Sequence, residues 1–103
     1  MESKGRNNIK SFEDLVCWQI CTEIRRDIFV MIKTFPKEEQ CALTEDMRRA
    51  SRSITHNIAE GYGRFHFKEN AQFCRLSRGC LYEIIDQLIT ALDGNIFQKN
   101  CIN

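Results

Sequence analysis

Residues 48–64 read RRASRSITHNIAEGYGR and carry four side chains that can be positively charged, at helical spacing. At about 100° per residue, Arg48, Arg49, Arg52 and His56 fall within a single arc of a helix roughly 100° wide. The planar guanidinium of arginine binds phosphate through two hydrogen bonds, so this arc could hold a nucleic-acid backbone. The alternative is a solvated charged face, or ion pairs with acidic residues of neighbouring helices or subunits.

Positive charge is concentrated in this part of the chain. The whole sequence has a formal net charge of +1, but residues 48–78 hold seven of its fifteen Lys and Arg residues and only two of its fourteen acidic residues. No base-reading motif accompanies these charges, which favours recognition of backbone or shape over recognition of sequence. We predict a nucleic-acid-binding surface that continues around a corner between two helices. Its residues are Arg48, Arg49, Arg52, His56, Arg64, Lys68, Arg75 and Arg78.

Four other residues of this stretch are interpreted as structural. A carboxylate repels phosphate, and Glu60 lies four residues before Arg64, so we predict an ion pair or a bond to free amides at the helix end. Asn57 borders the apolar face and is expected to bond neighbouring backbone. Gly61 and Gly63 follow the last periodic residue, and Gly61 is predicted to end the helix in the left-handed conformation.

We expect no enzymatic activity. Catalysis needs a nucleophile, a base and oxyanion donors that converge, and the sequence contains no triad pattern and no glycine-rich phosphate loop. Among six cysteines, Cys17 and Cys21 lie one helical turn apart and could form a metal pair completed by Cys74 or a histidine. No Cys-x-x-Cys or His-x3-His spacing supports such a site. The sequence therefore predicts no metal, no cofactor and reduced, structural cysteines.

Three helices must position these residues. Ser11 followed by Asp14 resembles a capping box and predicts a first helix over about residues 12–34. A second helix is predicted over 44–61, opened by a capping threonine, and a third over about 67–92 with a glycine as its stop. No strand-like alternation or repeat appears in the sequence. The predicted fold class is an all-α, antiparallel up-down helical bundle with short connections.

The first helix has more apolar residues than one face can bury. One broad apolar face is made by Val16, Cys17, Ile20, Cys21, Ile24, Ile28, Met31, Ile32 and Phe35. A second stripe, Leu15, Trp18 and Phe29, falls on another side with Thr22. We predict that another helix of the chain or a neighbouring subunit covers this stripe, which makes it a candidate oligomer interface. Scattered exposed hydrophobic residues are the alternative.

The third helix has a core face of its own. Its predicted members are Phe73, Cys74, Ser77, Cys80, Leu81, Ile84, Leu88, Ala91 and Leu92. Gly79, beside this face, is expected to be buried and to allow close approach of another helix, at a cost of about 1 kcal/mol relative to alanine.

Several segments resemble, in order and with compatible spacing, a family of small four-helix bundles. They are SFEDL at 11–15, the tryptophan at 18, FP at 35–36, RRAS-x-SI-x-x-NIAEG-x-GR at 48–64 and F-x-x-x-x-RGCLYE at 73–83. The family includes proteins encoded in intervening sequences of bacterial large-subunit ribosomal RNA genes. It also includes the accessory variability determinant of diversity-generating retroelements. The resemblance implies a non-enzymatic bundle that assembles as a homopentamer with a basic surface.

The resemblance also bears on partners and boundaries. For the retroelement members it implies binding of RNA or DNA together with a reverse transcriptase. Relatives continue beyond the position of Gly94 into a fourth amphipathic helix, whereas only NIFQKNCIN follows here, so we expect a truncated fourth helix. The predicted organisation is a flexible segment over residues 1–10, the bundle over 11–97 and a tail over 98–103.

The sequence-based hypothesis for function combines these features. It is a protein that assembles with itself and binds RNA or DNA backbone through a basic helix face. One alternative is an oligomeric scaffold that acts through a protein partner such as a reverse transcriptase. Another is a truncated copy without retained activity. No signal peptide or membrane span is evident, so the expected location is the cytoplasm.

Overall fold

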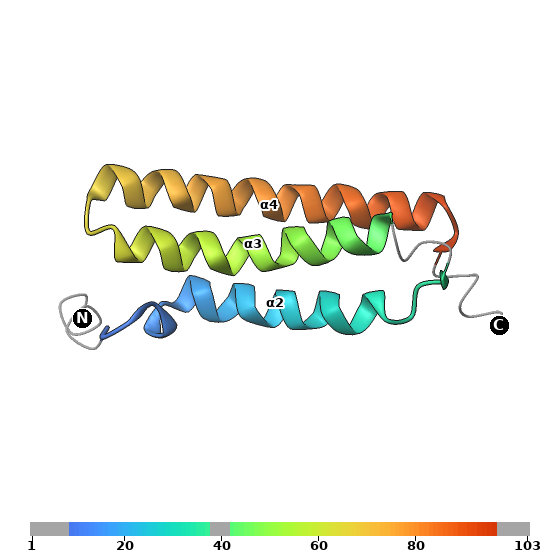
Figure 1. The fold of residues 1–103 in the computed structure, drawn as a ribbon, viewed down its shortest axis with the longest axis horizontal. Coiled ribbons are helices and arrows are strands. Elements are labelled where there is room, and N and C mark those ends of the chain that lie inside the picture. The colour runs from blue at the N-terminus through green and yellow to red at the C-terminus, as the bar shows by residue number, and fades with distance from the viewer. Residues whose placement is uncertain (1–8, 38–41, 97–103) are drawn as a thin grey trace.

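The computed structural model of the protein describes residues 9–37 and 42–96. After a single-turn 3₁₀ helix, η1 (Phe12–Asp14), the helices α2 (Val16–Ile32), α3 (Leu43–Gly63) and α4 (Phe67–Asp93) run antiparallel to their chain neighbours (Figure 1). No strand occurs in this part of the chain. The prediction of an all-α bundle with three long helices is confirmed. The predicted N-terminal segment, apart from residues 9 and 10, and the predicted tail lie outside the described residues.

The capping box forms, but it caps only η1. The Ser11 hydroxyl accepts a hydrogen bond from the Glu13 amide at 3.2 Å, and the Asp14 carboxylate accepts from two backbone amides at 2.8 and 3.2 Å. Leu15 then adopts extended backbone angles, so the predicted first helix is interrupted and α2 begins at Val16. The second helix likewise starts one residue before its predicted capping threonine and has no side-chain cap.

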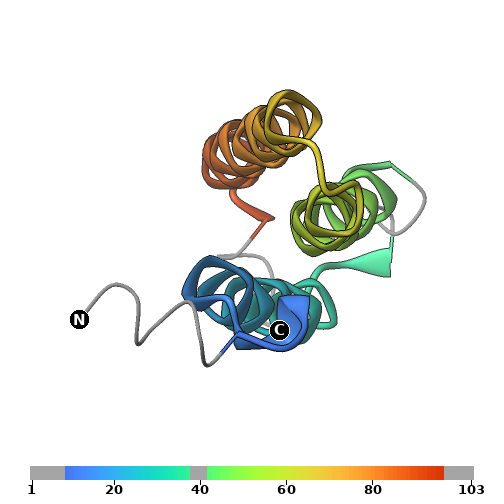
Figure 2. The same cartoon turned by 90° about the vertical axis from the view of Figure 1, so that its left-hand side faces the viewer.

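Helix α3 is the centre of the bundle. It packs against both α2 and α4, whereas α2 and α4 make few contacts with each other. Seen along the bundle, the three helices occupy three corners of a triangle (Figure 2). The core lies between them and consists of Cys21, Ile28, Ile32, Phe35, Met47, Ala50, Ile54, Ile58, Ile84, Ala91 and Ile96. The apolar side chains of α2 and α4 are buried against those of α3. This burial supplies the main stabilisation of the fold.

The predicted apolar faces of α2 and α4 were too broad. Val16 is 68% exposed and Ile20 54% exposed on α2, and Leu92 is exposed on α4. Cys17 and Cys74 are exposed as well. The prediction that these residues belong to the core is wrong, because only the sides of α2 and α4 that face α3 are covered.

The second apolar stripe of α2 is covered in part by the chain itself. Leu15, Trp18 and Phe29 are half-buried and pack against the core. The Trp18 ring also lies edge-on to Phe12, with 5.4 Å between ring centroids. Thr22, on the same side, is fully buried. Of the two predicted covers, a helix of the same chain is therefore present, and the oligomer interface stays a prediction.

Two glycines have roles other than those predicted. Gly61 is buried within α3, which continues to Gly63, and no glycine in the described residues has a positive φ. The left-handed cap predicted at Gly61 is therefore wrong. A Cβ added there would lie 2.9 Å from the Cβ of Phe73, so α4 packs directly against the backbone of α3 at Gly61. Gly79, predicted to be buried, is exposed with open space around it.

Candidate nucleic-acid interface

The outer face of α3, defined here as Arg48, Arg49, Arg52 and His56, points away from the core. Arg48 is half-buried and the other three are exposed. Met47, Ile54 and Ile58 occupy the opposite side of the same helix and fill the core. The 3.6-residue period that buries these apolar residues thus forces the basic residues outward.

Two arginines of the outer face are already paired within α3. Arg48 forms an ion pair with Glu45, and Arg49 Nη2 lies 3.2 Å from Asp46 Oδ1. Both pairs are solvent-accessible, and exposed pairs of this kind contribute at most about 1 kcal/mol. The alternative from the sequence placed the acidic partners on neighbouring helices or subunits, whereas the acids found here belong to α3 itself. An incoming phosphate could replace either acid at low cost.

Arg52 and His56 differ from Arg48 and Arg49 in that their side chains are unpaired within the described residues. Among the described residues, neither side chain makes a hydrogen bond or an ion pair. They lie one helical turn apart, so both can reach the same strand of a bound polyanion.

Arg64 sits at the corner between α3 and α4. Its Nη2 donates to Glu60 Oε2 at 2.9 Å, which is the predicted ion pair. Its guanidinium also lies over the Phe73 ring, 5.2 Å from the centroid. The predicted backbone bond of Asn57 is present too, since its Nδ2 donates to the Ser53 carbonyl at 2.9 Å. Of these contacts, the one between Arg64 and Phe73 joins the corner to α4.

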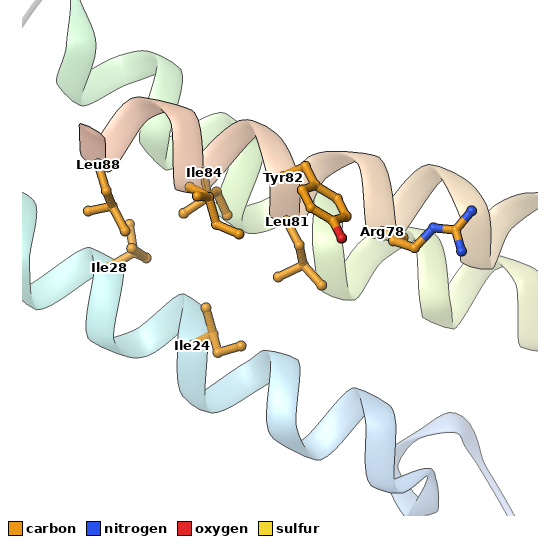
Figure 3. Close-up of a pocket in the computed structure, with 8 residues that line it drawn as sticks. Ile24, Ile28, Arg78, Leu81, Tyr82, Ile84 and Leu88 are labelled. Carbon is orange, nitrogen blue, oxygen red and sulfur yellow. The ribbon is translucent and has the colours of Figure 1, made fainter. Parts of the chain in front are cut away.

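The remaining predicted residues lie on α4. Lys68, Arg75 and Arg78 are exposed. Two cavities, of about 480 and 160 Å³, lie between α2 and α4, and Arg78 lines both of them (the larger is shown in Figure 3). It therefore does not share a side of the bundle with the outer face of α3. The structure therefore divides the predicted surface. One group is the outer face of α3 with Arg64 at the corner, and the other is on α4.

One contact between α2 and α3 was not predicted from the sequence. Arg25 Nη1 donates to Thr55 Oγ1 of α3 at 2.8 Å. Thr55 in turn donates to the Arg52 carbonyl at 3.3 Å. Arg25 thus ties α2 to the turn of α3 that carries Arg52. Its partner lies 30 residues away on another helix, so the sequence alone does not identify this contact.

Cys21 and Cys80 are free thiols, and the fold buries the first and half-buries the second. Burial raises the pKa of Cys21, and the nearby Cys17 raises it further. Burial, then Glu83, raises the pKa of Cys80, against a hydrogen bond with Ser53 that lowers it. At neutral pH both stay protonated, the form that is a poor nucleophile and a poor metal ligand. Across residues 9–37 and 42–96, no group of three or more His, Cys, Asp or Glu residues could hold a metal ion.

A family model described as 23S rRNA-intervening sequence protein matches residues 13–103. No curated protein and no solved structure gives a significant match. Within the described residues, none of the helices combines the length and the apolar character needed to cross a membrane.

Proposed function

Because the chain belongs to the 23S rRNA-intervening sequence protein family, we propose that it is a non-enzymatic bundle that binds nucleic acid through the phosphate backbone. The observation that carries the proposal is the outer face of α3. Its four basic side chains extend over about 12 Å of helix at 1.5 Å per residue. Phosphates along one strand of a duplex are spaced about 3.4 Å apart along the axis, so this face matches three or four of them.

Phosphate can replace the acids now paired with this face at little cost in free energy. Arg49 exchanges one exposed carboxylate for another anion, so little free energy is lost. Arg52 brings a charge without a partner among the described residues. Release of condensed counterions from the nucleic acid supplies the driving force. The proposal assigns no reaction, since an open helix face does not exclude water from a reacting group.

A salt titration tests the proposal. We expect a fluorescein-labelled 20-nucleotide single-stranded RNA to bind the full chain in fluorescence anisotropy. Log affinity should fall linearly with log salt, with a slope of about −0.7 for each phosphate contacted, or about −2 to −3 in total. DNA of the same length serves to compare the two sugars. No binding at 20 mM salt would contradict the proposal.

Charge reversal locates the surface in the same assay. The double variant Arg49→Glu/Arg52→Glu is expected to bind RNA at least tenfold more weakly and with a smaller salt slope. The matched control, Arg75→Glu/Arg78→Glu, makes the same change of charge on α4 and should have a much smaller effect. Equal losses in the two variants would assign binding to the overall charge of the molecule and not to α3.

We also propose that the chain assembles with itself, as the resemblance implies. The exposed apolar residues of α2, Val16 and Ile20, support this proposal, because large apolar side chains in water favour association. Light scattering after gel filtration should give a mass that is a multiple of 12.1 kDa, five-fold for a pentamer. A monomer at every concentration up to about 200 μM would contradict self-assembly.

A further inference from the structure

Two phenylalanine rings stand in solvent where α3 is joined to α4. The connection, residues 64–66, lies at the end of the bundle drawn on the left of Figure 1, which faces the viewer in Figure 2. Phe65 is 89% exposed and Phe67, the first residue of α4, is 87% exposed, whereas no other large hydrophobic residue of the described chain exceeds 68%. Neither ring makes an aromatic or cation–π contact there. Phe65 and Phe67, called the aromatic corner below, are thus open to a ligand.

The backbone at Phe65 adopts a conformation that a bulky side chain disfavours. Its φ is 65°, in the left-handed region, where the Cβ crowds the following carbonyl oxygen. Glycine takes this conformation without that cost. Because the Phe65 ring is exposed, packing within the described chain returns little of the free energy that the strain costs. Strained residues of this kind are concentrated at functional sites, including those that hold ligands.

The aromatic corner lies beyond the C-terminal end of the outer face of α3. His56 lies about 10 Å along the axis from Gly63, where α3 ends, at 1.5 Å per residue. Phosphates of one strand are about 3.4 Å apart, so a strand bound on the outer face reaches the corner within about three nucleotides. The exposed Arg64 lies between the two surfaces. The basic residues can therefore hold the backbone of a strand whose bases meet the rings.

The charges around the aromatic corner balance one another. Over residues 60–69 there are two cations, Arg64 and Lys68, and two carboxylates, Glu60 and Glu69. Aromatic residues that enter a membrane surface are typically accompanied by a surplus of Lys and Arg, which this corner lacks. A nucleic-acid base is uncharged and binds an aromatic ring by stacking, which needs no such surplus. The balance therefore favours bases over anionic lipid as the ligand of the rings.

We propose that the aromatic corner stacks unpaired bases of a single-stranded nucleic acid whose backbone lies on the outer face of α3. The inference rests on the proposed function and adds to it a preference for unpaired strands. In a duplex the faces of the bases are covered by their neighbours, whereas unpaired bases can turn out and stack on a side chain. Stacking accepts every base, in agreement with the absence of a base-reading motif from the sequence.

Removal of the rings tests the proposal in the anisotropy assay. The full chain with Phe65→Gly/Phe67→Ala should bind a 20-nucleotide oligouridine at least tenfold more weakly than wild type, because the stacking of both rings is lost. The salt slope should stay the same, since the rings carry no charge. A 20-base-pair RNA duplex should bind the two proteins within twofold of each other.

An exposed aromatic residue elsewhere provides the matched control. Tyr82 is 68% exposed and lies about 22 Å further along α4 than Phe67, at 1.5 Å per residue. Tyr82→Ala should bind oligouridine within twofold of wild type. A loss as large as that of the double ring variant would mean that the corner has no special role.

Single changes at Phe65 separate stacking from stability. Phe65→Gly should melt no lower than wild type, because glycine relieves the strain at φ 65° and only an exposed ring is lost. The same variant should bind oligouridine at least threefold more weakly. Phe65→Trp should keep wild-type affinity, since an indole ring also stacks on bases. A clearly lower melting temperature for Phe65→Gly would make the ring structural and would overturn the inference.

Three further results would overturn it. The first is wild-type affinity for oligouridine in the double ring variant, which leaves the proposed function intact. The second is an equal loss of single-strand and duplex binding. The third is loss of binding to vesicles of equal parts phosphatidylcholine and phosphatidylserine with RNA binding unchanged, which would assign the rings to a membrane. If wild type binds no RNA at 20 mM salt, the proposed function itself fails and the inference with it, so the two failures are distinguishable.

Discussion

Replacing Gly61 with alanine is expected to lower the free energy of unfolding by about 2–3 kcal/mol, even though alanine is the better helix former. The new Cβ would lie 2.9 Å from the Cβ of Phe73 and 3.3 Å from the backbone oxygen of Asn70. A Cβ and a backbone oxygen cannot turn aside as the end of a long side chain can. α4 must therefore move away from α3, and the packing around Phe73 loosens along with the ring that supports Arg64.

A matched glycine separates this contact from helix propensity. Gly79 lies in the middle of α4, and a Cβ there would meet nothing within 4 Å. Gly79→Ala should therefore stabilise the protein by up to about 1 kcal/mol. Urea unfolding followed by circular dichroism measures both changes. A gain at Gly61 as large as the gain at Gly79 would show that the two helices are not in close contact there.

The helices could be predicted because their signals are local. The apolar period and the breaks between periodic segments define each helix without reference to the rest of the chain. The role of Gly61 could not be found in this way. A glycine near the end of a helix suits a left-handed cap and suits a close contact equally well. Only the position of Phe73 on another helix distinguishes the two.

The same distinction applies to the basic residues. The Glu60–Arg64 pair was predictable, since a spacing of four places both on one side of one helix. No such rule relates Arg78 to Arg52. The two residues belong to different helices, and a helical wheel relates residues of one helix only. The rotation of α4 about its axis is fixed by Ser77, whose hydroxyl donates to the Ile54 carbonyl at 2.7 Å, and by the buried Ile84. That rotation turns Arg78 toward the cavities between α2 and α4.

Truncation of a buried side chain of α3 is expected to have the largest effect on the free energy of unfolding. Ile54 is fully buried, at 0% exposure, and Ile54→Ala should lower the free energy of unfolding by about 2–5 kcal/mol. α3 packs against α2 on one side and α4 on the other. Neither neighbour can move into the cavity without drawing α3 away from the other, so the cavity should persist and the cost should lie in the upper half of this range.

The comparison with an exposed isoleucine makes this prediction specific. Ile89 of α4 is 51% exposed, and Ile89→Ala should cost less than about 1 kcal/mol. The total stability of a domain of this size is only about 5–15 kcal/mol. Each kcal/mol lost lowers its melting temperature by about 4–8 °C, so the loss at Ile54 should lower it by at least about 10 °C. Thermal unfolding followed by circular dichroism measures the difference. Similar melting temperatures for the two variants would mean that α3 is not the centre of the core. A large loss at Ile54 alone would show that the fold is held together around α3.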